Sequence, residues 1–481
     1  MLLTLVIAYL LVTIAIGLVA AKRVKSSADF AIAGRHLPLA MIVTTTFATW
    51  FGSETVLGIP AKFVNSGLNG VVEDPFGAGS CLILVGLFFA GKLYRMNLLT
   101  ISDYYRERYG RSVEVICSII MVSYLGWVSA QVTALGLVFN LLSDGVISMP
   151  LGMTIGVVSV LAYTLFGGMW SVAITDFMQM IILVVGLATL AVFAGNQAGG
   201  ADKVLALAVS QDLFKFLPEP NMKDILFFVA AAITIMFGSI PQQDVFQRVM
   251  SANSLNAATK GPIIGGICYI LFAFVPMFLV VSALIIMPEQ AAQLIQDDPQ
   301  KVLPTLVMTQ MPFVMQVLFF GALLSAIKSC ASATLLAPSV TFTENIWRQF
   351  FPHQGDKQSL LAMRVTVLVF SALVLLYAIQ MQGSSIYEMV SGAYQVTLVG
   401  AFVPLLFGLY WSKATTQGAI FSIALGLSTW LLLLMTPAGE EFPAQLAGVL
   451  ASLAGMLIGS LAPQALKNKH GAHHVLQGTH L

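Results

Sequence analysis

The chain has 481 residues, of which 58% are hydrophobic and only 9% are charged, and its formal net charge is +1. No soluble globular protein needs so apolar a composition, so most of the chain must face lipid or pack among lipid-facing helices. The nearly neutral balance argues against a nucleic-acid partner, and the lack of a Gly-x-x-x-x-Gly-Lys-Ser signature argues against an ATP-driven pump.

Thirteen segments are predicted to span a bilayer, which requires about 20 largely apolar residues. In chain order they cover residues 2–21, 37–60, 69–91, 113–140, 147–166, 168–194, 223–241, 261–287, 312–342, 359–381, 384–410, 415–436 and 443–462. The first segment follows no basic residues and is too long for a typical signal peptide, so it is predicted to be a spanning helix. The cysteines form no Cys-x-x-Cys pair, which predicts neither a disulfide framework nor a zinc site.

The basic residues predict the orientation of the chain, because Lys and Arg accumulate in cytoplasmic loops. Seventeen of them fall in loops and a tail on one predicted side, and five on the other: Lys62, Lys203, Lys215, Lys223 and Lys301. The sequence therefore predicts an N-terminus outside the cell and a C-terminus inside.

Two of the spans contain signals that interrupt a helix. "TTTFATWFGSETVLGIP" (44–60) holds Gly52 and a polar Ser53-Glu54 pair, and "AAITIMFGSIPQQDVFQR" (231–248) holds Gly238 and Pro241. Each begins a set of five spans, and the two sets run in opposite directions through the membrane. Paired interruptions in inverted halves predict the binding site of a transporter, where freed backbone groups can bind ions or solute. The alternative is that Gly and Pro are simply common in membrane helices.

Three longer stretches resemble one known family. "YTLFGGMWSVAITDFMQ" (163–179), "PQQDVFQRVMSANSLNAA" (241–258) and "LFGLYWSKATTQGAIFSIALG" (406–426) are similar to signatures of the sodium:solute symporter family, whose members transport sugars, proline, pantothenate, choline and other solutes. The resemblance covers nearly the whole chain. It implies an all-α membrane protein of thirteen helices, with an inverted five-plus-five repeat of the leucine-transporter type. The first and sixth core helices would be broken.

The predicted organisation follows from this resemblance and the span count. An extra N-terminal helix and first cytoplasmic loop precede the core, an outer loop separates its two halves, and two helices and a cytoplasmic tail follow it. The corresponding ranges are 1–36, 37–194 for the first repeat, 195–222 for the outer loop, 223–411 for the second repeat, 412–462 and 463–481. The expected location is a cell membrane, either a bacterial inner membrane or a plasma membrane.

The segments nearest the first break are most similar to the choline-transporter branch of the family, in particular "ATWFGS" (48–53), Trp127 and "FQRVMSA" (246–252). In that branch aromatic residues enclose a quaternary ammonium by cation–π attraction. Trp50 and Trp127 match two walls of the enclosure, whereas Ala78 and Gln242 stand where aromatic residues are expected. Packing is the alternative role of the tryptophans. The solute is expected to contact residues around the two breaks: Thr49, Trp50, Gly52, Trp127, Gln131, Phe237, Gly238 and Gln242.

The family resemblance also implies a sodium site between the first broken helix and the eighth core helix. Its expected members are backbone carbonyls of the broken helix and side chains of the eighth: Ala48, Phe51, Ala326, Ser329 and Cys330. The last three fall within one arc of a helix that turns about 100° per residue. Cys330 offers a thiol where the family has a hydroxyl, and sulfur is a poor ligand for a hard cation.

A second cation site is expected around Asp176, which matches an aspartate of family members with two sodium ions. Of the two matching hydroxyl positions, Ser332 keeps its hydroxyl and Ala333 has lost it. Lys328 lies one helical turn from Ser332, at a depth similar to that of Asp176, and a charge buried in a membrane is nearly always paired. The hypothesis is that Lys328 and Asp176 form an ion pair that replaces the second sodium, as a fixed or a proton-titrating cation. The alternative is that Lys328 extends into a water-filled vestibule.

Further polar residues are expected to lie toward the outside. Glu54, Glu73 and Asp74 are predicted to line an outer vestibule that attracts cations, or alternatively to be solvated residues near helix ends. The tail "NKHGAHHVLQGTHL" (468–481) is predicted to be a short solvated segment, with metal binding by its histidines as the alternative. Apart from the coupling ion, Na⁺ or H⁺, no cofactor is expected.

The sequence therefore predicts a secondary active transporter that moves a small organic solute by alternating access. Sodium is the coupling ion that the family implies, and a proton or no ion is what the lysine hypothesis implies. A transporter-like sensor that signals through a partner chain is the alternative. An enzyme ranks last, because no nucleophile–base or metal constellation is present.

Overall fold

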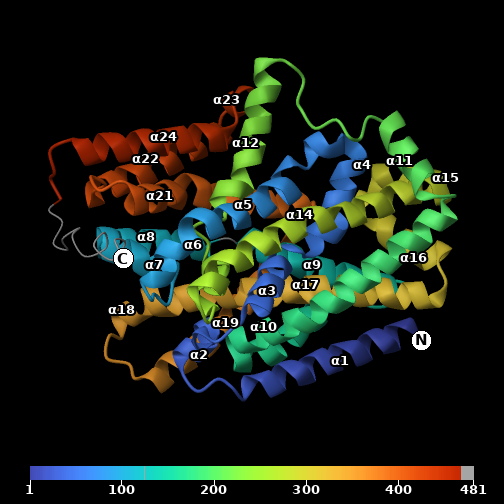
Figure 1. Ribbon diagram of the computed structural model, residues 1–481, viewed down its shortest axis with the longest axis horizontal. Helices are drawn as coiled ribbons and strands as arrows, with labels where there is room; N and C mark the ends of the chain where they lie inside the picture. Colours follow the sequence, from blue (N-terminus) through green and yellow to red (C-terminus); the bar gives the residue numbers. More distant parts are fainter. Residues whose placement is uncertain (124, 467–481) are drawn as a thin grey trace.

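The computed structural model describes residues 1–123 and 125–466, and these residues are almost entirely helical (Figure 1). The first helices are α1 Leu2–Ala21, α2 Ser27–Ile32, α3 Leu39–Trp50, α4 Ile59–Gly70, α5 Ala78–Leu84, α6 Ala90–Arg95, α7 Ile101–Tyr109, α8 Arg111–Val122, α9 Leu125–Leu142, α10 Met149–Gln197, α11 Ala201–Ser210 and α12 Met222–Gly238. They are followed by α13 Gln243–Ser251, α14 Leu255–Ile286, α15 Pro288–Asp297, α16 Val302–Gln310, α17 Phe313–Thr341, α18 Arg348–Phe350, α19 Asp356–Gln380, α20 Ile386–Thr397, α21 Val403–Tyr410, α22 Thr416–Leu434, α23 Ala438–Glu441 and α24 Ala444–Leu461.

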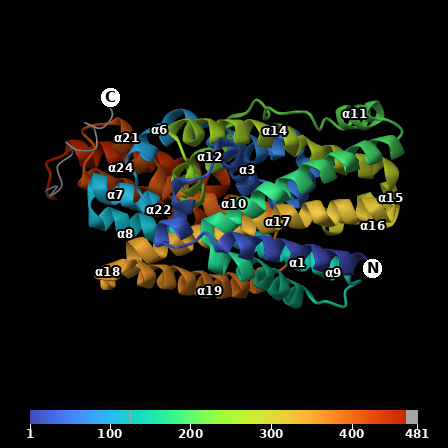
Figure 2. The same cartoon turned by 60° about the horizontal axis from the view of Figure 1, so that its bottom comes forward.

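Most of the long helices lie side by side in one bundle, with α1 along one edge and α22 and α24 along the opposite edge (Figures 1 and 2). The edge helices carry apolar side chains on their outer faces. Leu11 of α1 is 62% exposed, and Leu432 of α22 is 65% exposed. Such surfaces suit hydrocarbon rather than water, which agrees with the apolar composition.

Helix α17 lies at the centre of the bundle and positions the candidate site. Almost every side chain from Phe319 to Thr341 is buried, polar ones included. The helix packs against α1, α3, α9, α10 and α13. A helix surrounded in this way can present different residues to several neighbours at once, because successive side chains point about 100° apart.

Among the described residues, ten helices are long and apolar enough to cross a membrane, and eleven if the bent pair α12–α13 counts as one span. The thirteen spans expected from the sequence therefore stay a prediction. Two features account for the difference. Helix α10 runs for 49 residues through two predicted spans, with a non-helical backbone only at Gly168 (φ 46°, ψ −137°), and α3 is only 12 residues long.

Both interruptions that the sequence predicts are present. Helix α3 ends at Trp50, the backbone leaves the helical region at Phe51 (φ −80°, ψ 73°), and a π-helical turn (η2, Glu54–Gly58) follows. Helix α12 ends at Gly238 and meets α13 at an angle of 44°. These broken ends leave backbone carbonyls free in the interior of the bundle.

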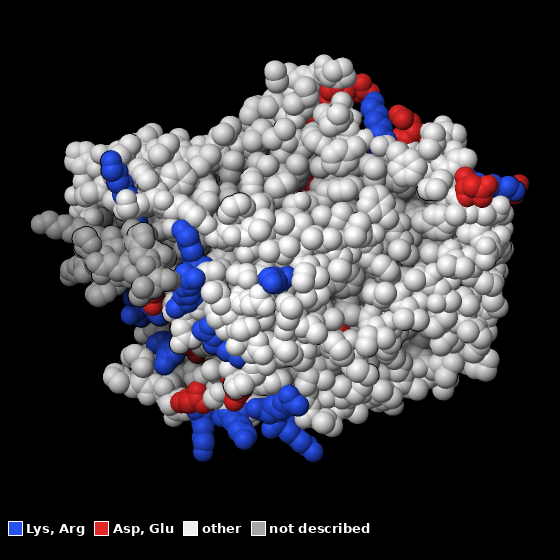
Figure 3. All heavy atoms as spheres, in the orientation of Figure 1, with Lys and Arg blue, Asp and Glu red and all other residues white. Residues whose placement is uncertain are grey.

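Charged side chains divide between the two ends of the bundle. Figure 3 shows Lys and Arg gathered at the end where α7, α8 and α18 lie in Figure 1. The chain begins at the other end of the bundle, the end at which α15 also lies (Figure 1). This distribution agrees with the excess of basic residues on one predicted side, and the assignment of that side to the cytoplasm stays a prediction.

Candidate functional site

The end of α3 and the middle of α17 meet directly. The Ser329 hydroxyl oxygen lies 3.4 Å from the carbonyl oxygen of Ala48, and the Cys330 thiol donates a hydrogen bond of 2.9 Å to the carbonyl of Thr49. Ala326 lies one turn earlier on the same buried helix. The structure thus brings together the two elements of the predicted sodium site. It gives the thiol the role of a hydrogen-bond donor.

Asp176 of α10 joins this cluster. Its carboxylate accepts hydrogen bonds from the Ser329 hydroxyl at 2.5 Å and from the Thr45 hydroxyl at 2.6 Å. All three side chains are fully buried. Asp176, Ser329, Thr45 and the Ala48 carbonyl therefore form one cluster of hard oxygen donors, the ligand type that alkali and alkaline-earth cations prefer. Thr45 was not predicted, although it lies one turn before Thr49 on the same helix.

Two buried carboxyl groups near this cluster share one buried guanidinium. Asp176 and Asp244 both interact electrostatically with Arg248 of α13, and all three residues are buried. No basic nitrogen lies within 4.0 Å of Asp176 in the part of the chain that the structure describes. One monovalent cation would balance the two carboxylates and the guanidinium.

The predicted ion pair between Lys328 and Asp176 is wrong. Lys328 is fully buried, but its ammonium donates a hydrogen bond of 2.6 Å to the Thr13 hydroxyl of α1 and lies 5.3 Å from the centre of the Tyr163 ring. The Lys328 side chain is directed toward α1, and no ion pair within the described residues joins it to Asp176, so it does not stand in for a sodium ion there. It does not extend into a vestibule either, because α1 covers it.

The predicted place of Ser332 in the second cation site stays a prediction. Its hydroxyl donates a hydrogen bond of 2.9 Å to the carbonyl of Ser329, within its own helix. Residue 329 takes the position next to Asp176 that was expected for residue 332. The two predicted cation sites therefore share one hydroxyl. Tyr9 of α1 also contacts α17, through a hydrogen bond of 2.5 Å with Ser325.

We expect the Thr13→Val variant to be less stable than the wild type, whereas Lys328→Met should be close to neutral. Valine leaves the buried ammonium without this partner, which costs about 1–3 kcal/mol. Methionine removes the buried charge itself and keeps an apolar chain of similar length, a change that is often neutral or stabilising.

Thermal unfolding of the purified protein measures both effects, and the double variant Thr13→Val/Lys328→Met should recover the stability of Lys328→Met. A double variant as unstable as Thr13→Val would show that the threonine acts through packing and not through the ammonium.

The first helix break is tightly packed around Gly52. A Cβ atom at this position would lie 2.8 Å from Glu54 Oε2, 2.9 Å from Cys330 Sγ and 2.9 Å from Gln131 Oε1. Gln131 of α9 donates to Glu54 Oε2 at 2.7 Å, and its own oxygen accepts from the backbone N–H of Ser53 at 3.0 Å. Gln131 therefore holds the break in place, and its predicted contact with the solute stays a prediction.

Three aromatic rings close the centre of the bundle between the two breaks. Trp50, Trp127 and Tyr394 have ring centres 5.3–5.4 Å apart in each pair, and all three are fully buried. The indole N–H groups of both tryptophans find no hydrogen-bond partner among the described residues. Tyr394 of α20 was missed by the sequence reasoning, because a tyrosine in an apolar helix carries no spacing that marks it.

At the second break, Gly238 lies against the aromatic residues between the two breaks, whereas the ring of Phe237 does not. A Cβ atom on Gly238 would lie 2.4 Å from the Tyr394 carbonyl oxygen, and the Gly238 carbonyl accepts a 2.6 Å hydrogen bond from Thr397. Gln242 lies near this contact, with its amide 3.4 Å from the Thr397 hydroxyl. The placement of Phe237 in the solute site is wrong, because its half-buried ring stacks on Phe402 in a separate apolar cavity of about 400 Å³.

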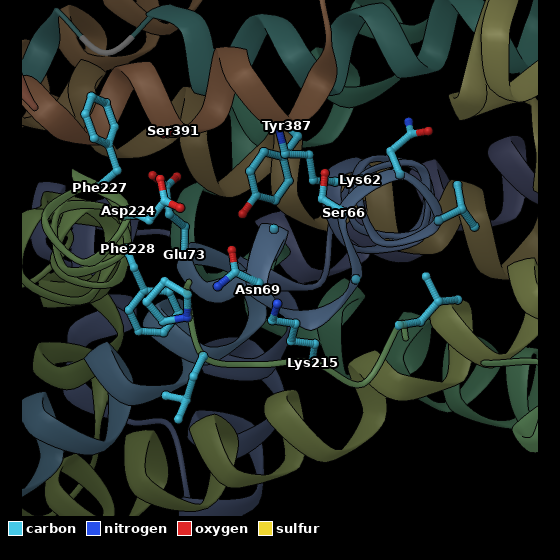
Figure 4. A pocket seen from close by; sticks show the side chains of 18 of the residues that line it. Lys62, Ser66, Asn69, Glu73, Lys215, Asp224, Phe227, Phe228, Tyr387 and Ser391 are labelled. Carbon is cyan, nitrogen blue, oxygen red and sulfur yellow. The ribbon is translucent and has the colours of Figure 1, made fainter. Parts of the chain in front are cut away.

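A cavity of about 830 Å³ lies near the end of α4, on the side predicted to face outward, and it is called the outer cavity below. Figure 4 shows Lys62 of α4, Glu73 of η3 (Val72–Gly77), and Tyr387 and Ser391 of α20 around it. Glu73 lines this cavity, and its place in an outer vestibule stays a prediction. Glu54 and Asp74 do not line it and are 0% and 1% exposed. Their acidic side chains are enclosed by neighbouring helices.

Other metal chemistry finds no support in the described part of the chain, where no group of three or more His, Cys, Asp and Glu side chains is placed to hold a metal ion. The histidine-containing tail lies outside the described residues. The predictions made for it, a solvated segment or a metal site, are not addressed by the structure.

Solved structures share this arrangement of two interrupted helices packed on a continuous buried helix. A Na⁺-coupled sialic acid symporter in a substrate-bound outward-open state matches with a TM-score of 0.82 at 18% identity, over 96% of this chain and 97% of that chain. Mhp1, a nucleobase-cation-symport-1 family transporter, matches with a TM-score of 0.57 at 15% identity, over 90% and 94%. The sequence profile of the sodium:solute symporter family matches residues 30–426. The chain belongs to that family.

Curated relatives are transporters of small organic solutes. High-affinity choline transporter 1 of Caenorhabditis elegans is 25% identical over 470 residues, which cover 92% of this chain and 80% of that protein. The human high affinity choline transporter 1 is 26% identical over 448 residues (89% and 75%). The high-affinity proline transporter PutP of Bacillus subtilis is 25% identical over 462 residues (94% and 96%). The chain is a multi-pass membrane protein, and these relatives favour transport over catalysis.

Proposed function

We propose that the protein is a sodium-coupled symporter for a small organic cation that carries an oxygen acceptor. The observation that carries this proposal is the pairing of two features at the first break. A cluster of hard oxygen donors lies on one side of Trp50, and an aromatic enclosure lies on the other. Ion and solute would both bind to the broken end of α3, so that each stabilises the same conformation and their transport is coupled.

The sodium site of the proposal consists of Asp176, Ser329, Thr45 and the Ala48 carbonyl. The carboxylate compensates for the thiol at position 330, and the local charge balance leaves room for one positive charge. Because the Lys328 ammonium bonds Thr13 of α1, the only described positive charge that interacts with Asp176 is the Arg248 guanidinium, which Asp244 shares. Sodium is therefore favoured over the sodium-independent mechanism that the ion-pair hypothesis implied.

The solute site of the proposal is the aromatic enclosure. The faces of Trp50, Trp127 and Tyr394 attract a positive charge, and each ring contributes about 0.5–2 kcal/mol when desolvated. The two indole N–H groups without partners suit a solute with a hydroxyl, carbonyl or carboxylate oxygen. The rings touch one another, so a solute enters only after they separate. The choline transporters among the relatives agree with this solute class.

A thermal-shift screen tests the proposal, because a ligand stabilises the folded form by mass action. Purified protein would be screened against quaternary and primary amines, amino acids, sugars and carboxylates in sodium or potassium buffer. Hits would then be tested for uptake into proteoliposomes. Stabilisation by organic cations only in sodium, followed by sodium-driven uptake, is expected. Binding without any uptake would contradict transport and favour a sensor that acts through a partner chain.

We expect the Trp127→Leu variant to bind the cationic hit at least about tenfold more weakly, which corresponds to about 1.4 kcal/mol. Trp127→Phe, which keeps a π face, should recover part of that affinity. Titration by tryptophan fluorescence or calorimetry gives both values. Equal losses for leucine and phenylalanine would show that the indole N–H, and not the ring face, contributes the binding energy.

A further inference from the structure

Three carboxylates lie between the outer cavity and the first helix break. Glu73 of η3 faces the cavity and is about nine-tenths buried, Asp74 follows it in the chain, and Glu54 lies at the start of η2 beside the break. Glu73 interacts electrostatically with Asp74, and Asp74 with Glu54. The three therefore form a continuous line from the outer cavity into the interior of the bundle.

The two inner carboxylates each keep an oxygen without a partner. Glu54 Oε2 accepts from Gln131, and Asp74 Oδ1 accepts from the Tyr269 hydroxyl, while Glu54 Oε1 and Asp74 Oδ2 find no hydrogen-bond partner among the described residues. Both side chains are at least 99% buried. A buried carboxylate oxygen without a partner costs free energy unless it binds a positive charge or a proton.

Hydroxyl groups connect this pair to the break itself. The Tyr269 hydroxyl donates to Asp74, and its oxygen lies 2.9 Å from the Thr55 hydroxyl oxygen, which in turn lies 2.9 Å from the carbonyl oxygen of Trp50. On the other side, Gln131 links Glu54 to the N–H of Ser53. A change in the charge of the pair therefore acts on the backbone on both sides of Phe51 and Gly52.

The other titratable groups that face the pair provide no positive charge close to it. They are Glu73 of η3, Tyr269 of α14, Cys330 of α17 and Tyr387 of α20, with Lys62 of α4 acting on Glu73. None of the ion pairs formed within residues 1–123 and 125–466 includes Glu54 or Asp74. Two interacting carboxylates in a low dielectric cannot both stay ionised without a cation.

From this arrangement we infer that Glu54 and Asp74 form a proton-binding site, loaded from the outer cavity past Glu73, whose protonation controls the first helix break. One carboxyl of the pair holds the proton and the other stays ionised. The proton reaches the pair from water in the cavity through the Glu73 carboxylate, and it leaves by the same route when the pair ionises. The hydroxyl chain and Gln131 transmit the change to the end of α3. A role of this site in coupling rests on the proposed transport function, whereas the existence of the proton site does not.

Infrared difference spectroscopy of the full-length protein in lipid tests the site without a solute. The carbonyl stretch of a protonated carboxyl group is separate from that of an ionised one. We expect a protonated-carboxyl band that persists at neutral pH and disappears in alkaline buffer, and that the double variant Glu54→Gln/Asp74→Asn lacks. In the matched control Glu344→Gln the band should remain, because Glu344 is a buried carboxylate paired with Arg348 at 2.6 Å.

The wild type alone can overturn the inference, even if the double variant fails to fold. A neutral-pH spectrum without the band would do so, and so would a band that sodium chloride removes, because the pair would then be a metal-ion site. In Glu73→Gln the band should shift more slowly after transfer to D₂O than in the wild type, and an unchanged rate would refute loading past Glu73. If the band is present but no solute is taken up, only the proposed function is contradicted. If a solute is taken up but the band is absent, only this inference is contradicted.

Discussion

The Asp176→Asn variant should lose the stabilisation that sodium gives to the wild-type protein. A ligand at about 100 times its Kd stabilises the folded form by about 2.7 kcal/mol. Asparagine keeps one carbonyl oxygen but removes the negative charge, and its amide N–H₂ replaces one of the two oxygens that accept from Thr45 and Ser329, so one of these hydroxyls loses its acceptor. We expect sodium affinity to fall at least tenfold and sodium-driven uptake to be lost.

The measurement is the shift in unfolding temperature between sodium and potassium buffers of equal ionic strength. Asp103→Asn is the matched control, because Asp103 is a buried aspartate that pairs with Arg106 at 3.0 Å, outside the candidate site. Its sodium shift should equal that of the wild type. A full sodium shift in Asp176→Asn would remove Asp176 from the sodium site and leave the coupling ion of the proposal without support.

The Gly238→Ala variant adds a single methyl group, and we expect it to disturb the second break strongly. The added Cβ would lie 2.4 Å from a backbone oxygen of Tyr394 and 3.2 Å from the Cβ of Leu398, so α12 and α20 would have to separate. Overpacking of this kind costs about 1–3 kcal/mol. Separation also moves Tyr394 away from the two tryptophans, so we expect uptake to fall at least tenfold.

Gly392→Ala on the same helix α20 is the matched control. No atom lies within 4 Å of a Cβ added there, and alanine in a helix is favoured over glycine by about 0.5–1 kcal/mol. Thermal unfolding should therefore show a loss of stability for Gly238→Ala and a small gain for Gly392→Ala, and uptake should fall only in Gly238→Ala. Equal stability of both would mean that the contact between Gly238 and Tyr394 yields without cost.

The backbone features of the site follow from local sequence signals. Gly52, Gly238 and Pro241 mark both breaks, because these residue types favour interruption wherever a membrane helix contains them. The approach of α17 to α3 follows from the family resemblance together with the arc shared by Ala326 and Ser329. Such inferences depend on one helix at a time or on a whole-chain match. They therefore do not require knowledge of which helices pack together.

The partner of Lys328 depends on which helices are neighbours, and the sequence order hides this. Helix α1 is apolar along its whole length, so no polar stripe identifies the face that packs inward. A weak signal was nevertheless present. Tyr9 and Thr13 share one face of α1 at i and i+4, and Ser325 and Lys328 share one face of α17 at i and i+3. Matching these two polar pairs would have found the contact.

The burial of Glu54 and Asp74 also could not be predicted. Their place near the outer end of a span suggests solvent, whereas their exposure is set by side chains from α9 and α14 that arrive from far along the chain. Gln131 and Tyr269 provide the hydrogen bonds that make this burial tolerable. Polar residues in apolar helices are therefore better indicators of a shared network than of a particular surface.

The contacts of α1 have a consequence for how the chain can be shortened or fused. The family profile begins at residue 30, which suggests that the first helix is dispensable. Deleting Leu2–Ala21 would instead uncover an ammonium and leave it against hydrocarbon, at a cost of at least about 2.5 kcal/mol. A truncated protein would tolerate the deletion only with an uncharged residue at position 328. The first helix and residue 328 are therefore constrained to change together.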